Sequence, residues 1–208
     1  MKLIFDIDGT LADTALATIP AFRALCKAHN WACPTDAQIR DAIGIANPDF
    51  YYHLFPDYPR ELVFEVGQQV EAAEESDVFA CGEKILFPGV RAMLDALIDM
   101  GVTLYVASTG DRAHVSAVLK AGGITELFEA IHCHEPSKEN MIARIIDGGD
   151  KSDWVMVGDR DKDIKGARAN GIKALGAGFG YVRDSDRQLY DMVFEKPNDL
   201  VEWVKVRI

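Results

Sequence analysis

Two carboxylates near the N-terminus are the clearest candidates for chemistry in this sequence. Asp6 and Asp8 lie at the end of an apolar segment, residues 2–7, and a glycine follows them. This segment predicts a short buried strand, and reactive side chains in open parallel sheets gather at the carboxyl ends of the strands. One carboxylate could attack while its neighbour moves a proton. The alternative is a calcium loop, but Leu11 and Ala12 supply none of the further oxygen ligands that it needs.

Four further polar side chains follow an apolar run or open the helix after one: Ser108, Lys138, Asp159 and Asp163. This ordered set resembles the haloacid dehalogenase superfamily, and the resemblance runs from Asp6 to the last predicted strand at residues 192–194. It is similar in particular to phosphoglycolate phosphatases that carry a small helical cap.

The resemblance implies a role for each acidic residue. Asp6 is expected to be the nucleophile that forms an aspartyl-phosphate, and Asp8 the general acid and base whose backbone carbonyl also reaches the metal. Asp6 and Asp159 would hold Mg²⁺, which prefers hard oxygen ligands, with Asp163 as a water-mediated ligand. For Asp159 and Asp163, the alternative role is to cap the N-terminus of a helix. Capping explains one aspartate, but not two at positions i and i+4.

Phosphate binding is expected from Ser108 and from the backbone amides of Thr109 and Gly110 at the start of a helix. Without Asp6, the same three residues would indicate only an ordinary turn after a strand. By resemblance, Lys138 pairs with Asp6 and with the phosphate.

The lysine position departs from one common family form, in which lysine directly precedes a proline. Here that position is Glu135, before Pro136, and Lys138 matches a second form with the lysine at the start of the next helix. Lys151 and Lys162 are predicted to be solvated charges.

The same residues narrow the reaction. Dehalogenases and phosphonate hydrolases of this superfamily usually carry an aromatic residue or an alanine where Asp8 stands, so both are disfavoured. Similar phosphomutases carry a histidine where this chain has Thr18. We therefore expect a Mg²⁺-dependent phosphatase acting on a small phosphoglycolate-like monoester. A sugar phosphomutase remains an alternative. A noncatalytic binding protein is a second alternative, but such a protein would be expected to lack Asp6 or Asp159, and this chain has both.

Two kinds of segment must position these residues. Residues 14–84 show helical periodicity, and four prolines divide them into roughly four helices. After residue 85 helices and strands alternate, which predicts an α/β fold with a doubly wound parallel sheet, the Rossmann-like core of the superfamily. We therefore expect a core of residues 1–13 and 85–208 and an inserted α-helical cap of residues 14–84. Cap residues that could contact a substrate are Arg40, Gly44, Asn47, Tyr51, Tyr52 and His53.

Composition limits the partners. The chain has 208 residues and a formal net charge of -11, which disfavours nucleic acid and anionic membrane surfaces as partners but not a small phosphate ester. No apolar run approaches the roughly 20 residues of a membrane span. The four cysteines form no Cys-x-x-Cys pair, so reduced packing cysteines and a cytoplasmic protein are expected. His132 and His134 could offer two imidazoles from one face of a strand, but no third metal ligand is evident.

Overall fold

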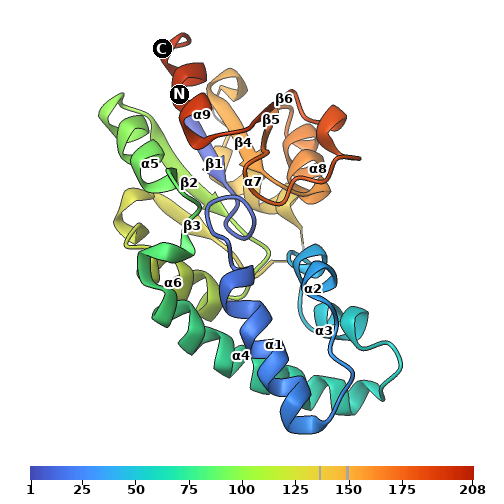
Figure 1. Cartoon of the computed structure of the whole chain (residues 1–208). Coiled ribbons are helices and arrows are strands. Elements are labelled where there is room, and N and C mark those ends of the chain that lie inside the picture. The colour runs from blue at the N-terminus through green and yellow to red at the C-terminus, as the bar shows by residue number, and fades with distance from the viewer. Residues whose placement is uncertain (136, 149) are drawn as a thin grey trace.

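The computed structural model describes residues 1–135, 137–148 and 150–208, so Pro136 lies outside the described residues. Its centre is a six-stranded parallel sheet in the order β3-β2-β1-β4-β5-β6 (Figure 1). The strands are β1 (Lys2–Phe5), β2 (Thr103–Ala107), β3 (Ala130–His132), β4 (Trp154–Gly158), β5 (Lys173–Ala177) and β6 (Met192–Phe194). The strand order reverses on either side of β1, which makes the carboxyl end of β1 the place where such sheets bind ligands.

Helices cover both faces of this sheet because successive side chains of its central strand point to opposite faces. Leu3 and Phe5 pack with α5, α6 and α9, whereas Ile4 packs with α7 and α8. These helices are α5 (Val90–Asp99), α6 (Arg112–Ala121), α7 (Lys138–Ile146), α8 (Asp161–Ala169) and α9 (Pro197–Lys205). The predicted doubly wound α/β core is confirmed.

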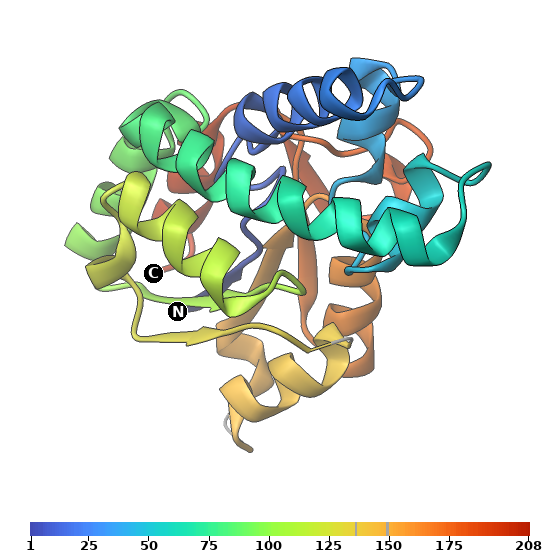
Figure 2. The same ribbon diagram turned by 90° about the horizontal axis from the view of Figure 1, so that it is seen from below.

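A separate helical layer lies beyond the carboxyl edge of the sheet. It consists of α1 (Ala15–His29), α2 (Asp36–Ala42), α3 (Asp49–Leu54) and α4 (Arg60–Cys81), with α1 and α4 side by side (Figures 1 and 2). These helices share an apolar cluster of their own, in which the Phe22 ring stacks on Tyr51 and Phe55. We propose that this layer is the predicted cap of residues 14–84.

Short 3-10 segments complete the described elements: Gly82–Ile85, Thr125–Leu127, Lys151–Asp153 and Arg187–Leu189. Within the described residues, no helix has both the length and the apolar character that a membrane span requires.

One helix begins earlier than its apolar pattern predicts. The sequence predicts a start at Ile164, but α8 begins at Asp161. Asp163 accepts hydrogen bonds from the backbone N–H groups of Asp159 (3.0 Å) and Arg160 (2.9 Å). Because these bonds satisfy donors that a helix start leaves open, they add a polar first turn that the apolar periodicity does not reveal.

Candidate active site

The carboxyl ends of three neighbouring strands bring the predicted residues to one edge of the sheet. Phe5, the last residue of β1, pairs with the residues two positions before Ser108 and Asp159. Asp6 follows directly, and its backbone N–H donates to the Val157 carbonyl at 2.9 Å. The side chains of Asp6, Ser108 and Asp159 are all buried. Strand register therefore brings Asp6 together with two residues that lie more than a hundred positions further along the chain.

Lys138 is the cation at the centre of this edge. Its side chain is 2% exposed, and Nζ lies 2.7 Å from Asp6 Oδ1 and also contacts Asp163. Burial by itself would lower the pKa of Lys138, but Asp163 and Asp6 raise it above its ordinary value. Lys138 therefore stays protonated and holds Asp6 in place. The structure brings this lysine to the position where the sequence analysis expected it.

Three buried carboxylates, those of Asp6, Asp159 and Asp163, offer ligand atoms within 4.8 Å of one another. Burial raises the pKa of Asp6 to about 7, with Lys138 acting in the opposite direction. The pKa of Asp159 is raised well above its ordinary value by burial and then by Asp6 and Asp163. Lys138 and Arg160 oppose these rises only in part, so a further cation would stabilise the charged cluster.

Asp159 offers a free ligand atom in this cluster. Its Oδ1 accepts a hydrogen bond from the Thr10 hydroxyl at 2.8 Å. Its Oδ2 is buried and has no hydrogen-bond partner among the described residues, although Arg160 Nε lies 3.2 Å away. A buried carboxylate oxygen without a donor is costly unless a cation binds it. The donor set therefore fits a divalent, oxygen-preferring ion such as Mg²⁺.

Asp163 has a different position in the cluster from the other two carboxylates. Its Oδ1 contacts Lys138 and its Oδ2 accepts the two backbone N–H bonds that start α8. Helix capping and membership of the acidic cluster are thus combined in one residue, whereas the sequence analysis treated them as alternatives. With both oxygens engaged, Asp163 fits the expected water-mediated contact to a metal better than direct ligation.

The loop after β2 contains the residues predicted to bind phosphate, and one of their backbone amides is hydrogen-bonded within the loop. Ser108 Oγ accepts a hydrogen bond from the Gly110 N–H at 3.1 Å. Asp111 then caps α6 by accepting from the backbone N–H of His114 at 2.9 Å. Thr109 and Gly110 line the cavity above the carboxylates. Anions bind well at such helix starts, so phosphate binding by this loop stays our prediction.

His114 is a functional candidate that the sequence analysis missed. Its Nε2 lies 2.7 Å from Asp8 Oδ1, and both side chains are largely buried. Burial by itself would lower the pKa of His114, but Asp8, followed by Glu74 and Asp111, raises it to about 10. Burial opposes ionisation of Asp8, yet the charge and hydrogen bond of His114 hold the pKa of Asp8 below its ordinary value. The two side chains therefore form a buried ion pair.

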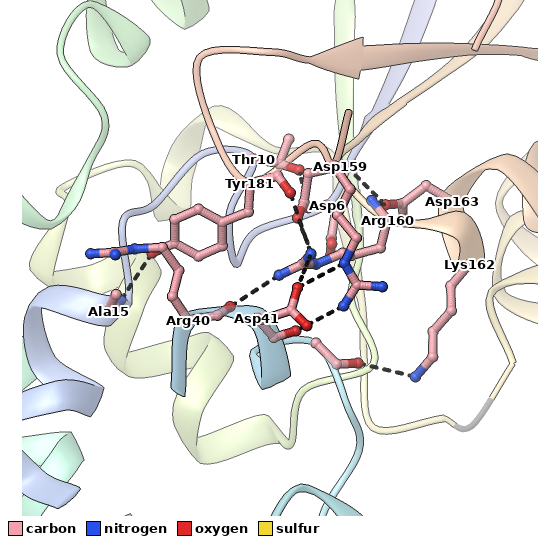
Figure 3. A network of polar contacts seen from close by, with 12 residues as sticks. Asp6, Thr10, Ala15, Arg40, Asp41, Asp159, Arg160, Lys162, Asp163 and Tyr181 are labelled. Atoms are coloured by element: carbon pink, nitrogen blue, oxygen red, sulfur yellow. Dashed lines mark hydrogen bonds and ion pairs between the residues drawn. The ribbon is translucent and has the colours of Figure 1, made fainter. Parts of the chain in front are cut away.

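Arg160 and Lys162, which follow Asp159, make polar contacts that connect the helical layer to the sheet (Figure 3). Arg160 donates to the backbone carbonyls of Arg40 at 3.0 Å and Tyr181 at 3.3 Å. Lys162 donates to the Gly44 carbonyl at 3.0 Å. The prediction that Lys162 is a solvated charge is therefore wrong, because the first turn of α8 packs against the helical layer.

The loop that contains Gly180 and Tyr181 packs directly on the turn around Gly9. The Tyr181 N–H donates to the Gly9 carbonyl at 3.0 Å, and the Tyr181 hydroxyl contacts Asp13 and accepts from the Ala15 N–H at 3.0 Å. A Cβ at Gly180 would lie 1.8 Å from the Gly9 oxygen. The absence of a side chain at Gly180 therefore permits this close backbone packing.

A cavity of about 580 Å³ opens above Asp8, between α3 and α4 on one side and the start of α6 on the other. Of the six cap residues expected near a substrate, the cavity is lined by Gly44, Asn47 and Tyr51. Tyr52 instead packs under Arg60. His134 also lines the cavity, but it follows β3 with a φ of 64°, so the expected pair of imidazoles on one strand face is wrong.

Sequence signals exist for some of the residues that were missed. His114 lies in the first turn of the helix after Ser108, a place where ligand-binding groups are common. Thr10 lies two residues after Asp8 in the same turn. Glu74, which contacts the Thr18 hydroxyl, offers no such signal. It lies in the middle of α4, and only the packing of that helix brings it to the cavity.

Comparison with known proteins agrees with this arrangement. The family model for haloacid dehalogenase-like hydrolases matches residues 3–177, a range that contains every carboxylate of the site. Probable phosphatase IndB of Dickeya dadantii is 28% identical over 186 residues, covering 86% of this chain and 81% of that protein. A phosphoglycolate phosphatase of Agrobacterium fabrum is 29% identical over 192 residues, covering 86% and 80%.

A solved structure has the same fold. A solved structure of a predicted phosphoglycolate phosphatase from Haemophilus somnus matches with a TM-score of 0.85. The match covers 97% of this chain and 96% of that one at 20% identity, which shows a common fold. This chain therefore belongs to the haloacid dehalogenase-like hydrolase family, and it is a phosphomonoester hydrolase.

Proposed function

We propose that the protein is a Mg²⁺-dependent phosphatase that hydrolyses a small-metabolite phosphate monoester, of about the size of phosphoglycolate, through an aspartyl-phosphate. The observation that carries this proposal is the buried cluster at the end of β1. There, Asp6 lies 2.7 Å from Lys138, and Asp159 keeps one buried oxygen without a hydrogen-bond donor. We also propose a cytoplasmic location, an expectation that rests on the sequence.

The reaction would proceed in two displacements at phosphorus. In the first, an Asp6 carboxylate oxygen bonds to phosphorus, the ester P–O bond breaks, and Asp8 passes a proton from the His114 imidazolium to the leaving oxygen. In the second, Asp8 takes a proton from water as the water oxygen attacks phosphorus, which frees Asp6 and inorganic phosphate. His114, 2.7 Å from Asp8, holds this carboxylate in place and takes the proton back, which restores the ion pair.

Charge neutralisation must supply much of the rate, since phosphate monoesters require on the order of 20 kcal/mol of transition-state stabilisation. Lys138 would hold Asp6 and one phosphoryl oxygen, while Ser108 and the amides of the following turn would hold the others. Asp6, the Asp8 carbonyl and Asp159 would bind Mg²⁺, with Asp163 acting through water. The ion supplies positive charge between the nucleophile and the phosphate dianion.

The two alternative functions have less support. Thr18 stands where similar phosphomutases have a histidine, and its hydroxyl lies between two acceptors, the Thr14 carbonyl at 3.0 Å and the Glu74 carboxylate. A hydroxyl held in this way does not shuttle protons, which favours hydrolysis. A noncatalytic protein would not need Asp6 and Asp159 buried in one acidic cluster, with Lys138 paired to Asp6.

The test is turnover of metabolite phosphates and p-nitrophenyl phosphate with Mg²⁺ and with a chelator, for the wild type and Asp6→Asn. We expect Mg²⁺-dependent release of phosphate by the wild type. Asp6→Asn should lower kcat by more than about 100-fold with an unchanged far-UV circular dichroism spectrum, because the amide keeps the shape but not the nucleophile. Activity of Asp6→Asn above that level would refute the assigned nucleophile, and full activity in chelator would refute the metal.

A further inference from the structure

The cavity above Asp8 is where the leaving group must lie, on the proposed function, because Asp8 is the group that protonates the leaving oxygen. Its volume of about 580 Å³ is in the ordinary range for small-molecule sites. The Thr14 hydroxyl lies in its wall, is buried, and has no hydrogen-bond partner among the described residues. A polar group held in this way is available to a ligand.

The walls of this cavity carry mainly negative charge. Six carboxylates line it: Asp8, Glu71, Glu74, Glu75, Asp111 and Glu135. None of the described lining residues is a lysine or an arginine, and the histidines among them are His114 and His134.

The ion pairs leave most of this charge uncompensated. His114 pairs with Asp8, and Arg144 contacts Glu135. Within the described residues, no salt bridge involves the four other carboxylates, Glu71, Glu74, Glu75 and Asp111.

The hydrogen bonds of two of these carboxylates come from neutral groups. Glu71 accepts from the Asn47 amide at 2.7 Å, and Glu74 contacts the Thr18 hydroxyl. Burial raises the pKa of both carboxylates, and neither has a cationic partner in an ion pair of the described residues, so a bound cation would favour their charged forms. A second anionic group on a substrate would face them at short range in a partly desolvated site, where like charges repel strongly.

The apolar part of the wall also favours a cation. Phe50 and Tyr51 line the cavity together with Ile43 and Ile45. An ammonium group over an aromatic face gains further attraction, and this attraction grows when water is excluded. Carboxylates and aromatic rings together are the surroundings that bind amines.

We propose that this cavity selects a phosphate monoester whose leaving group carries a positive charge, that is, the phosphate of an amino alcohol. Leaving groups with a carboxylate or a second phosphate are rejected by the acidic wall. This proposal differs from the phosphoglycolate-like substrate expected from the sequence in the charge of the leaving group, not in the size of the molecule.

Three substrates of nearly equal size isolate this effect: 2-aminoethyl phosphate, 2-hydroxyethyl phosphate and 2-phosphoglycolate. With Mg²⁺ at neutral pH, we expect kcat/KM to fall in that order, by about tenfold for each step of charge, which corresponds to about 1.4 kcal/mol. Equal or better turnover of 2-phosphoglycolate than of the amine would overturn the proposal.

Glu74→Gln tests whether the wall causes the ranking, since glutamine keeps the size and can still accept from Thr18. The ratio of amine to carboxylate turnover should fall at least about threefold, and Glu71→Gln should lower it as well. Glu61→Gln is the matched control, because Glu61 is exposed on the same helix and does not line the cavity. An unchanged ratio in both Glu74→Gln and Glu71→Gln would refute the role of the wall.

Binding separates this proposal from the proposed function. The affinities of the same three compounds for Asp6→Asn in Mg²⁺, measured by isothermal titration calorimetry, should follow the same order without any turnover. If no phosphate ester is hydrolysed, including p-nitrophenyl phosphate, the proposed function fails while the binding order still decides the charge preference. Tighter binding of 2-phosphoglycolate than of the amine contradicts the charge preference.

Discussion

Replacement of Lys138 by methionine removes one charge from the centre of the site and keeps an apolar side chain in its space. Lys138 lies 2.7 Å from Asp6 Oδ1 and also contacts Asp163, and its side chain is 2% exposed. In Lys138→Met these two carboxylates face each other without the cation. Removal of one partner from a buried ion pair typically costs about 3–5 kcal/mol, so we expect a loss of this size in the free energy of unfolding.

The effect on catalysis should be at least as clear. A phosphate dianion approaching Asp6 would meet a carboxylate neutralised by the metal alone. Loss of one preorganised electrostatic contact typically lowers kcat by about 100-fold or more, so we expect kcat/KM to fall by at least that factor. Added Mg²⁺ should recover part of the lost stability, because the ion binds the same carboxylates, but not the lost activity.

Two measurements decide this prediction. Urea denaturation followed by circular dichroism gives the stability with and without Mg²⁺, and steady-state kinetics with p-nitrophenyl phosphate give kcat/KM. Lys165→Met is the control, since Lys165 is 67% exposed and pairs with Asp161 on the surface, where such pairs contribute less than about 1 kcal/mol. Near-normal kcat/KM in Lys138→Met would show that this lysine has no role in the reaction.

Asp159→Ala should abolish the Mg²⁺-dependent activity, and a titration with excess Mg²⁺ should not restore it fully. Full activity in chelator would refute the metal role. His114 has a folded-state pKa of about 10 against an ordinary value of 6.5, so the stability that its charge contributes is fully present below pH 6.5 and is lost as pH rises through about 10. Urea denaturation at pH 6, 8 and 10 should show a steeper loss for wild type than for His114→Gln, and parallel curves would contradict the ion pair with Asp8. Gly180→Ala should cost about 2 kcal/mol or more and lower kcat, because its Cβ would lie 1.8 Å from the Gly9 oxygen; wild-type stability and kcat would show that the loop adapts.

The sequence by itself determined the elements and the edge at which chemistry is placed. Alternating apolar runs and helical periods predict a parallel sheet, and a parallel sheet places strand ends together. Asp6, Ser108 and Asp159 each follow a strand, so their convergence could be expected before any coordinates. Lys138 opens the helix after β3, and its contact with Asp6 agrees with that expectation.

Only the tertiary structure decided what surrounds these groups. His114 reaches Asp8 across 106 residues, and Lys162 reaches the Gly44 carbonyl across 118. Glu74 enters the cavity because α4 packs over the start of α6. Periodicity fixes which face of a helix is apolar, but the rotation and position of that helix against distant elements decide which polar side chain meets which partner. The charge of the cavity, and with it the expected substrate, therefore depends on packing rather than on any local pattern of residues.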